Sequence, residues 1–320
     1  MIVLIIPLLY IVQSQTTTNT TTATTTTTTI SYANQGSDWS QGVCSSSSSQ
    51  SPINLEVSSG TCDNSMVLDI QFKKEAMQIV MERVQHTIQS NATISNLYAT
   101  DINGNLYGYT ATQFMFHGPS EHTIEGTRYD LEMQIVHELK SEFSATITKA
   151  IVSILFEVSS TDQPFFTTYD FALMAAPTTS NTTSNTTANQ TNSTNTTTAK
   201  PVTSTIASIN FNDLLGSQLD ANPAYYTYIG SLTIPDCDDN VNWYILDSVL
   251  PITQTQLDAF NTFFLSNTTF ASGNGNNRAI QSTNDRVIKK GGVACEEQFV
   301  YFFSFFILYI FINYFIFKLL

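Results

Sequence analysis

The feature that most constrains how this chain can fold is a series of segments in which apolar and polar residues alternate. A period of two is typical of strands that bury one face of a sheet. Residues 150–158 are instead almost continuously apolar and rich in β-branched side chains, which is typical of a buried strand. The chain is therefore expected to consist mainly of strands. They are expected at Met66–Phe72, Met77–Gln89, Ala111–His117, Leu131–Leu139, Ala150–Val158, Tyr225–Thr233 and Val241–Leu246.

One helix is expected after these strands. Leu257, Phe260 and Phe264 recur at helical spacing, and either Thr253 or Thr255 can cap the first turn. The sequence contains no internal repeat, no phosphate-binding glycine loop, no HExxH motif and no nucleophile elbow. The expected architecture is therefore a long, mostly antiparallel β structure with few helices.

Two tracts cannot contribute to a hydrophobic core. Residues 15–30 are nearly pure threonine, and residues 177–205 consist mostly of Thr, Asn and Ser. Neither holds enough apolar side chains to offset the entropy of ordering, so both are expected to be disordered. The first would form an N-terminal arm. The second would interrupt one large folded domain, residues 31–290, as a surface loop, because the entropic cost of closing a loop grows slowly with its length.

The two ends of the chain are apolar. Residues 1–14 are typical of a secretory signal peptide, and the alternative of an N-terminal anchor is weaker because the apolar run is too short to span a bilayer comfortably. Residues 299–320 form an apolar, aromatic tail after a short spacer at 291–298. The tail fits a transmembrane segment and a GPI-anchor signal equally. Both alternatives predict a domain in the secretory pathway or at the cell surface, with the membrane as a partner through the tail.

Cysteines and sequons agree with such a location. Four cysteines are an even number, as expected for disulfides, and none lies in a CxxC pair that would favour a zinc site. A formal charge of −14 and an isoelectric point of 4.4 argue against nucleic acid as a partner, because phosphates require a basic surface. N-linked glycosylation is expected at Asn19, Asn91, Asn181, Asn185, Asn189, Asn192, Asn195 and Asn267, each of which stands two residues before a Ser or Thr.

Several motifs occur in a defined order along the chain. They read QSPI (50–53), QFMFHGPSEH (113–122), LEMQIVH (131–137), GSLTIPDC (230–237) and NNRAIQ (276–281). Together they resemble the signature motifs of the alpha-carbonic anhydrases, over a region that runs from residue 31 to residue 288. The resemblance implies the fold of that family, which is mainly β (α+β). Its central twisted sheet is mostly antiparallel, with about ten strands and peripheral helices.

In that family three neutral histidines hold a catalytic zinc ion, and a water molecule takes the fourth position. The corresponding positions here are Met115, His117 and Gln134, so two of the three ligands are replaced. A thioether suits Cu(I) rather than zinc, and a neutral carboxamide is a weak ligand. The other histidines do not rebuild the site. His122 matches a structural histidine, and His137 lies three residues from Gln134, so on a strand it is expected to point to the opposite face.

Other residues match the rest of the family's catalytic machinery. Glu121 and Thr233 match the pair in which the carboxylate accepts the threonine hydroxyl proton and thereby orients the zinc-bound hydroxide. Glu132 matches the carboxylate that orients the third ligand; beside Gln134 it can accept an amide N–H instead. His86 matches the proton shuttle. The apolar pocket wall corresponds to Val136, Ile151, Leu232, Ile234 and Trp243, with Ile234 in place of a usual threonine.

The resemblance also implies a disulfide between Cys44 and Cys237, which would clamp the N-terminal segment to the loop beside Thr233. By elimination, Cys62 and Cys295 remain for a second bridge. Cleavage for an anchor before Cys295 would leave Cys62 single.

The leading hypothesis is an extracellular domain similar to the catalytically inactive carbonic anhydrase-related proteins, with no cofactor and with vestigial catalytic residues. It would act as a binding or structural module for an unidentified extracellular protein or small ligand. The alternative is a divergent carbonic anhydrase in which His117, Gln134 and water hold zinc. A third hypothesis places the function in the glycosylated tracts, with the domain as a spacer. Ordinary structural roles are also open: His117 as a hydrogen-bonded pocket histidine, and Met115 as packing in the vacated metal space.

Overall fold

Long strands dominate the computed structural model of this chain, which describes residues 30–56, 60–84, 86–167, 202–216, 223–265 and 271–292. The strands are β1 (Asn54–Leu55), β2 (Gly60–Cys62), β3 (Leu68–Phe72), β4 (Met77–Arg83), β5 (Ile88–Ser90), β6 (Ser95–Thr100), β7 (Leu106–His117), β8 (Thr123–Ile124), β9 (Thr127–Arg128), β10 (Leu131–Leu139), β11 (Lys149–Val158), β12 (Val202–Ile209), β13 (Tyr225–Ser231), β14 (Asp239–Leu246), β15 (Leu250–Ile252) and β16 (Ile288–Gly291). The helices are α1 (Pro164–Thr167), α3 (Asn212–Leu215) and α4 (Gln254–Phe264).

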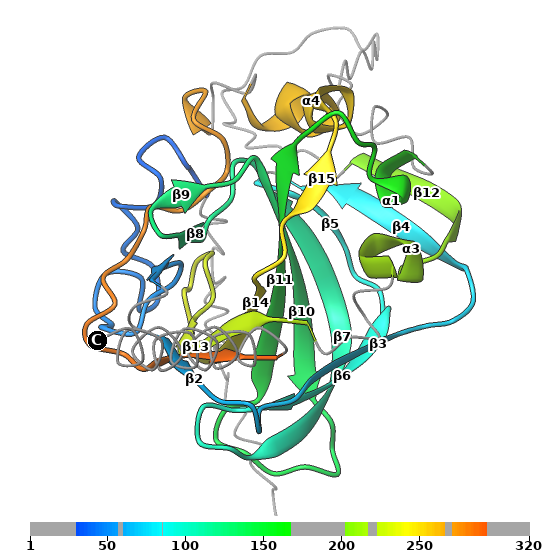
Figure 1. Cartoon of the computed structure of the whole chain (residues 1–320). Coiled ribbons are helices and arrows are strands. Elements are labelled where there is room, and N and C mark those ends of the chain that lie inside the picture. Colours follow the sequence, from blue (N-terminus) through cyan, green and yellow to red (C-terminus); the bar gives the residue numbers. More distant parts are fainter. Residues whose placement is uncertain are drawn as a thin grey trace, which may run out of the picture.

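Within the described residues, one sheet of 13 strands organises the molecule (Figure 1). The order of its main path is β12-β4-β5-β7-β10-β11-β14-β13-β16-β2. Off this path, β6 pairs with both β7 and β3, and β15 pairs with β11. A small sheet, β1-β8-β9, is separate from it. The predicted β-rich class with few helices is therefore confirmed, with more strands than the sequence predicted.

Most strand pairs in this sheet are antiparallel, as predicted, but the sheet is mixed rather than purely antiparallel. β10 runs antiparallel to both of its neighbours, β7 and β11. β11, however, pairs in parallel with β14 and with β15, and β16 pairs in parallel with β2. Parallel neighbours require long crossover connections, and alternation within single strands carries no information about such connections.

The two faces of the central strands build two different cores. On β7 and β10, the side chains of Phe114, Phe116, Met133 and Ile135 enter a large apolar cluster that also includes buried residues of α1, α3 and α4. Phe116 packs against Phe260 of α4 with ring centroids 4.9 Å apart.

The opposite face of these strands contributes to a second, smaller cluster. Met115, Val136, Ile151 and Trp243 belong to it. This separation of alternate residues is what a period of two predicts, and it places the family's metal-ligand positions on the second face.

The predicted helix is confirmed as α4. Thr253 is its N-cap: its hydroxyl accepts a hydrogen bond from the N–H of Gln256, whose side chain bonds back to the N–H of Thr253. Leu257, Phe260 and Phe264 are all buried. Of the two caps weighed from the sequence, Thr253 is therefore the one used.

Two predicted segment boundaries were wrong. Met77–Gln89 is not one strand, because the Val84 N–H donates to the Thr87 carbonyl and turns the chain so that β4 and β5 pair antiparallel. The tract at 177–205 was predicted to be disordered to its end, but β12 begins at Val202 and pairs with β4. Ile209 of β12 is buried, so the apolar residues that follow the Thr-rich part dock this strand on the core.

The disulfide implied by the resemblance is present. Cys44 and Cys237 are joined, with their Cα atoms 4.9 Å apart. Cys62 is also disulfide-bonded, but Cys295, its predicted partner, lies outside the described residues.

Several predicted segments cannot be compared with the structure. The signal peptide, the threonine arm, most of the 177–205 tract and the apolar tail lie outside the described residues, as do the predicted glycosylation sites other than Asn91. Among the residues that the structure does describe, no helix has the length and hydropathy needed to cross a membrane.

Candidate functional site

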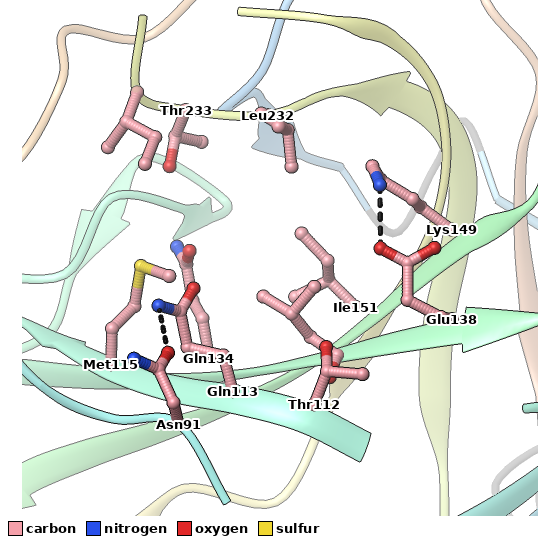
Figure 2. A pocket seen from close by; sticks show the side chains of 12 residues that line it. Asn91, Thr112, Gln113, Met115, Gln134, Glu138, Lys149, Ile151, Leu232 and Thr233 are labelled. Atoms are coloured by element: carbon pink, nitrogen blue, oxygen red, sulfur yellow. Dashed lines mark hydrogen bonds and ion pairs between the residues drawn. The ribbon is translucent and has the colours of Figure 1, made fainter. Parts of the chain in front are cut away.

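A cavity of about 290 Å³ opens on the second face of the sheet, over β7, β10 and β11 (Figure 2). The segment after β13 closes its other side with Leu232, Thr233 and Ile234. The complete lining consists of Asn91, Thr112, Gln113, Met115, Gln134, Val136, Glu138, Lys149, Ile151, Leu232, Thr233 and Ile234.

The three metal-ligand positions of the resemblance lie close together on β7 and β10. Met115 and His117 lie two apart on β7, and Gln134 of β10 is the direct cross-strand partner of Met115. All three side chains are buried, and Met115 and Gln134 line the cavity. In Figure 2 both extend toward the end at which Thr233 lies. The positions assigned from the motifs are thus neighbours in space.

His117 is held in one orientation. Its Nδ1 lies 2.9 Å from the backbone carbonyl of Asn276, and a carbonyl can only accept, so Nδ1 carries the proton. In the neutral imidazole, Nε2 is then the unprotonated nitrogen. It is fully buried and has no hydrogen-bond partner among the described residues. A lone pair of the kind that binds a metal is therefore present at this position.

Gln134 is committed to two carboxylates. Its Nε2 donates to Glu121 Oε2 at 2.8 Å and to Glu132 Oε1 at 3.0 Å. A primary amide has two N–H groups, so both are used. The amide nitrogen therefore faces the two acids, and the carbonyl oxygen is the only atom left for any other partner.

Glu132 is the centre of a dense hydrogen-bond network. Besides Gln134, it accepts from the backbone N–H groups of Glu121 and His122 at 2.7 and 2.9 Å, from Ser153 Oγ at 2.8 Å and from His122 Nδ1 at 2.9 Å. Burial alone would raise the pKa of Glu132, but the charge and the donors of His122 outweigh it and lower the pKa to about 2. Glu132 is therefore ionised in the folded protein.

Glu121 is not joined to Thr233 as the resemblance implied. Its Oε1 accepts from the backbone N–H of Arg278 at 2.8 Å, and its Oε2 accepts from Gln134. No hydrogen bond connects Glu121 with Thr233 within the described part of the chain, although Thr233 is buried and lines the cavity. Arg278 occupies one carboxylate oxygen of Glu121 and Gln134 occupies the other. The expected hydrogen bond from Thr233 to Glu121 is therefore not formed.

His122 and His137 have structural roles. The Nε2 atom of His122 bonds to the Tyr228 hydroxyl at 2.8 Å while its Nδ1 holds Glu132. His137 points away from the cavity, as its spacing from Gln134 predicts: it bonds to Ser95 at 3.1 Å. Burial lowers the pKa of His137 to about 4, so it is neutral at physiological pH.

His86 lacks the properties of a proton shuttle. It is not among the residues that line the cavity. Burial is the main cause that lowers the pKa of His86 to about 4. A proton carrier works best when its pKa lies near the operating pH. His86 is neutral at physiological pH, so it is poorly suited to carry protons.

The predicted apolar wall is present except for one member. Val136, Ile151, Leu232 and Ile234 line the cavity. Trp243 does not line it: the side chain is fully buried in the second cluster, and its indole N–H donates to the Ser231 carbonyl at 2.9 Å.

The sequence interpretation missed the polar residues at the cavity mouth. Gln113 donates to Asn91 at 2.9 Å, and Lys149 forms an ion pair with Glu138 at 2.6 Å. Thr112 also lines the cavity. Glu138 lies an even number of residues from Gln134 on the same strand, so alternation could have placed it in the cavity. Thr112 lies an odd number of residues from Met115, so alternation would have placed it on the opposite face.

The donor set at the three ligand positions is a poor match for zinc. Zinc sites in proteins are built from imidazole, thiolate and carboxylate. Here the three positions supply one imidazole, one thioether and one amide whose N–H groups already hold two acids. Across the described ranges, no group of three or more His, Cys, Asp or Glu residues is arranged to hold a metal ion.

Comparison with known proteins gives a consistent set of relatives. A sequence profile described as eukaryotic-type carbonic anhydrase matches residues 34–291. The carbonic anhydrase of Dunaliella salina is 28% identical over 274 residues, which are 80% of this chain and 42% of that protein. The carbonic anhydrase of Neisseria gonorrhoeae is 27% identical over 247 residues, 77% of this chain and 79% of that protein. The chain thus spans less than half the length of the algal relative.

A solved structure adds a likeness in three dimensions. Dioscorin complexed with ascorbate has a TM-score of 0.61 and 24% identity to this chain, with 82% of this chain and 98% of dioscorin covered. At that level of identity the likeness shows a shared fold.

Proposed function

Because the chain belongs to the eukaryotic-type, or alpha, carbonic anhydrase family, we propose that its folded domain is a carbonic anhydrase-like module of the cell surface that does not hydrate carbon dioxide. The family and fold expected from the motifs are confirmed. The loss of activity and the location remain our proposal. In this role the domain binds a partner or supports a surface structure, and its catalytic residues are vestigial.

One observation carries the proposal. Gln134 occupies a ligand position and turns both of its N–H groups toward Glu121 and Glu132. A metal ion needs a lone pair at that point, and the amide nitrogen presents protons instead. With Met115 at the second position, His117 is the one conventional zinc ligand of the three.

A second candidate function has one observation in its favour. The Nε2 atom of His117 is a buried nitrogen lone pair with no partner among the described residues. Such an atom costs free energy when it is left unpaired. A divergent carbonic anhydrase, with zinc held by His117, the Gln134 carbonyl and water, would satisfy it.

The surface location is supported by independent features of the sequence. They are the apolar segment at 1–14, the sequons, the apolar tail at 299–320 and the Cys44–Cys237 disulfide, a bond typical of oxidising compartments. The tail would attach the domain to the membrane as a transmembrane segment or through a GPI anchor. Immunostaining of intact cells, with and without phosphatidylinositol-specific phospholipase, tests the location and separates the two anchors.

Metal analysis combined with stopped-flow carbon dioxide hydration tests the proposal. The protein is purified from secretory-host cells and dialysed against zinc, and both measurements use the same sample. We expect no stoichiometric zinc and no hydration above the buffer rate. Stoichiometric zinc with hydration that acetazolamide inhibits would refute the proposal and establish the divergent enzyme.

A further inference from the structure

The mouth of the cavity is framed by two polar pairs. Asn91 and Gln113 form one, and Glu138 and Lys149 form the other. Figure 2 shows the two pairs on opposite sides of the lining, with Ile151 between them. Asn91 is exposed and the other three side chains are half-buried, so the two pairs lie at the outer part of the lining.

Asn91 is also the acceptor residue of a glycosylation sequon. The residues Asn91-Ala92-Thr93 lie in the connection between β5 and β6, outside any strand. The side chains of Asn91 and Thr93 are both exposed. Surface loops are where such sequons are modified in secreted proteins.

The geometry of the Asn91 amide is compatible with a glycan. Its Oδ1 accepts the hydrogen bond from Gln113 at 2.9 Å, so the carbonyl side of the amide is fixed on the cavity rim. N-linked glycosylation replaces a hydrogen on Nδ2 and leaves Oδ1 available as an acceptor. The bond from Gln113 can therefore persist and hold the first sugar at the opening.

From this geometry we infer that Asn91 carries an N-linked glycan that stands across the mouth of the cavity and screens it from large molecules. The inference rests on the proposed passage through the secretory pathway. Its consequence is specific: small molecules reach the cavity, whereas a protein partner binds on another face of the domain. The apolar wall of Val136, Ile151, Leu232 and Ile234 then serves as a small-ligand site rather than as a protein interface.

Thr93→Ala provides a clean way to remove the glycan. It destroys the sequon but leaves Asn91 and its bond with Gln113 in place, and Thr93 is exposed, so folding is preserved. Asn91→Gln removes the glycan by a different change. An effect shared by both variants is therefore due to the glycan.

Lys149 is a natural reporter at the cavity mouth. Its side chain is 33% exposed and ion-paired with Glu138. Lys289, ion-paired with Asp63 and 21% exposed, is a matched reference, because β13, β14, β11 and β10 separate its strand from β7. The full chain, produced in secretory-host cells, is acylated with a small and with a bulky amine-reactive ester, and labelling at each lysine is quantified by mass spectrometry.

We expect Asn91 to be glycosylated. We also expect both variants to raise bulky-ester labelling of Lys149 several-fold relative to Lys289, with little change for the small ester. Equal bulky labelling of Lys149 with and without the glycan would overturn the inference. So would an unmodified Asn91 in a protein whose other sequons are glycosylated, a result that leaves the proposed surface location intact. A protein with no glycan at any sequon would overturn both the inference and the location.

Discussion

Replacing Gln134 by leucine tests whether the amide holds the two buried acids together. The variant removes the donor to Glu121 Oε2 and one donor to Glu132 Oε1. Hydrogen bonds to charged groups are worth about 1.5–3 kcal/mol each, and leaving a buried charge without its partner costs about 3–5 kcal/mol. Glu132 keeps the donors of His122 and Ser153, so most of the cost falls on Glu121.

The expected loss of stability is therefore about 3 kcal/mol. For a domain of this size, each kcal/mol shifts the melting temperature by about 2–4 °C, so the melting temperature should fall by roughly 6–12 °C. Differential scanning calorimetry at neutral pH measures the change.

Gln113→Leu is the matched control. Gln113 is also a glutamine on the cavity-lining strands, but it is only half-buried and its one hydrogen bond goes to the neutral Asn91. Its replacement should cost no more than about 1 kcal/mol. If Gln134→Leu melts within about 2 °C of the wild type, a shift of less than about 1 kcal/mol, the argument that the amide replaces the metal centre is wrong.

Three further results are expected. The double variant Met115→His with Gln134→His should take up zinc in equilibrium dialysis, because the Nε2 atom of His117 and the carboxylate of Glu132 are already in place. A folded double variant that binds no zinc would mean that the pocket has been remodelled. Cys44→Ser should lower the free energy of unfolding by about 2–5 kcal/mol in denaturant titrations, since it opens a long covalent loop; an unchanged midpoint would contradict this. The pKa of Glu132, lowered from 4.5 to about 2, should contribute about 3 kcal/mol that is fully present above pH 4.5 and is lost as the pH falls toward 2. Glu132→Gln should flatten that acid limb, and a limb of unchanged slope would assign acid unfolding to other groups.

Much of the fold could be predicted because alternation and burial are properties of short segments. The strands β10 and β11 and the helix α4 lie where the sequence places them. Strand direction depends on long connections, which is why the parallel pairing of β11 with β14 was not anticipated. The break between β4 and β5 was missed because the apolar pattern continues through the turn.

The site was predictable by position but not by hydrogen bonding. The motifs brought Met115, His117 and Gln134 to one place, as two strands in register require. They did not indicate that Glu121 would bond to Gln134 rather than to Thr233. That choice depends on which donor reaches the carboxylate in three dimensions, and a motif specifies residue types rather than distances.

The same amide explains why catalytic-looking residues persist around a site that is poorly suited to zinc. A histidine ligand at position 134 would offer Glu132 one N–H, whereas the amide offers an N–H to Glu132 and a second one to Glu121. The buried acids are therefore satisfied by the protein itself, without a metal and without the threonine hydroxyl. Each acid also holds backbone N–H groups, Glu132 those of Glu121 and His122, and Glu121 that of Arg278. Removing either acid would leave these donors unpaired in the core. Their presence is thus required by the fold, and it carries no evidence of its own that the domain is an enzyme.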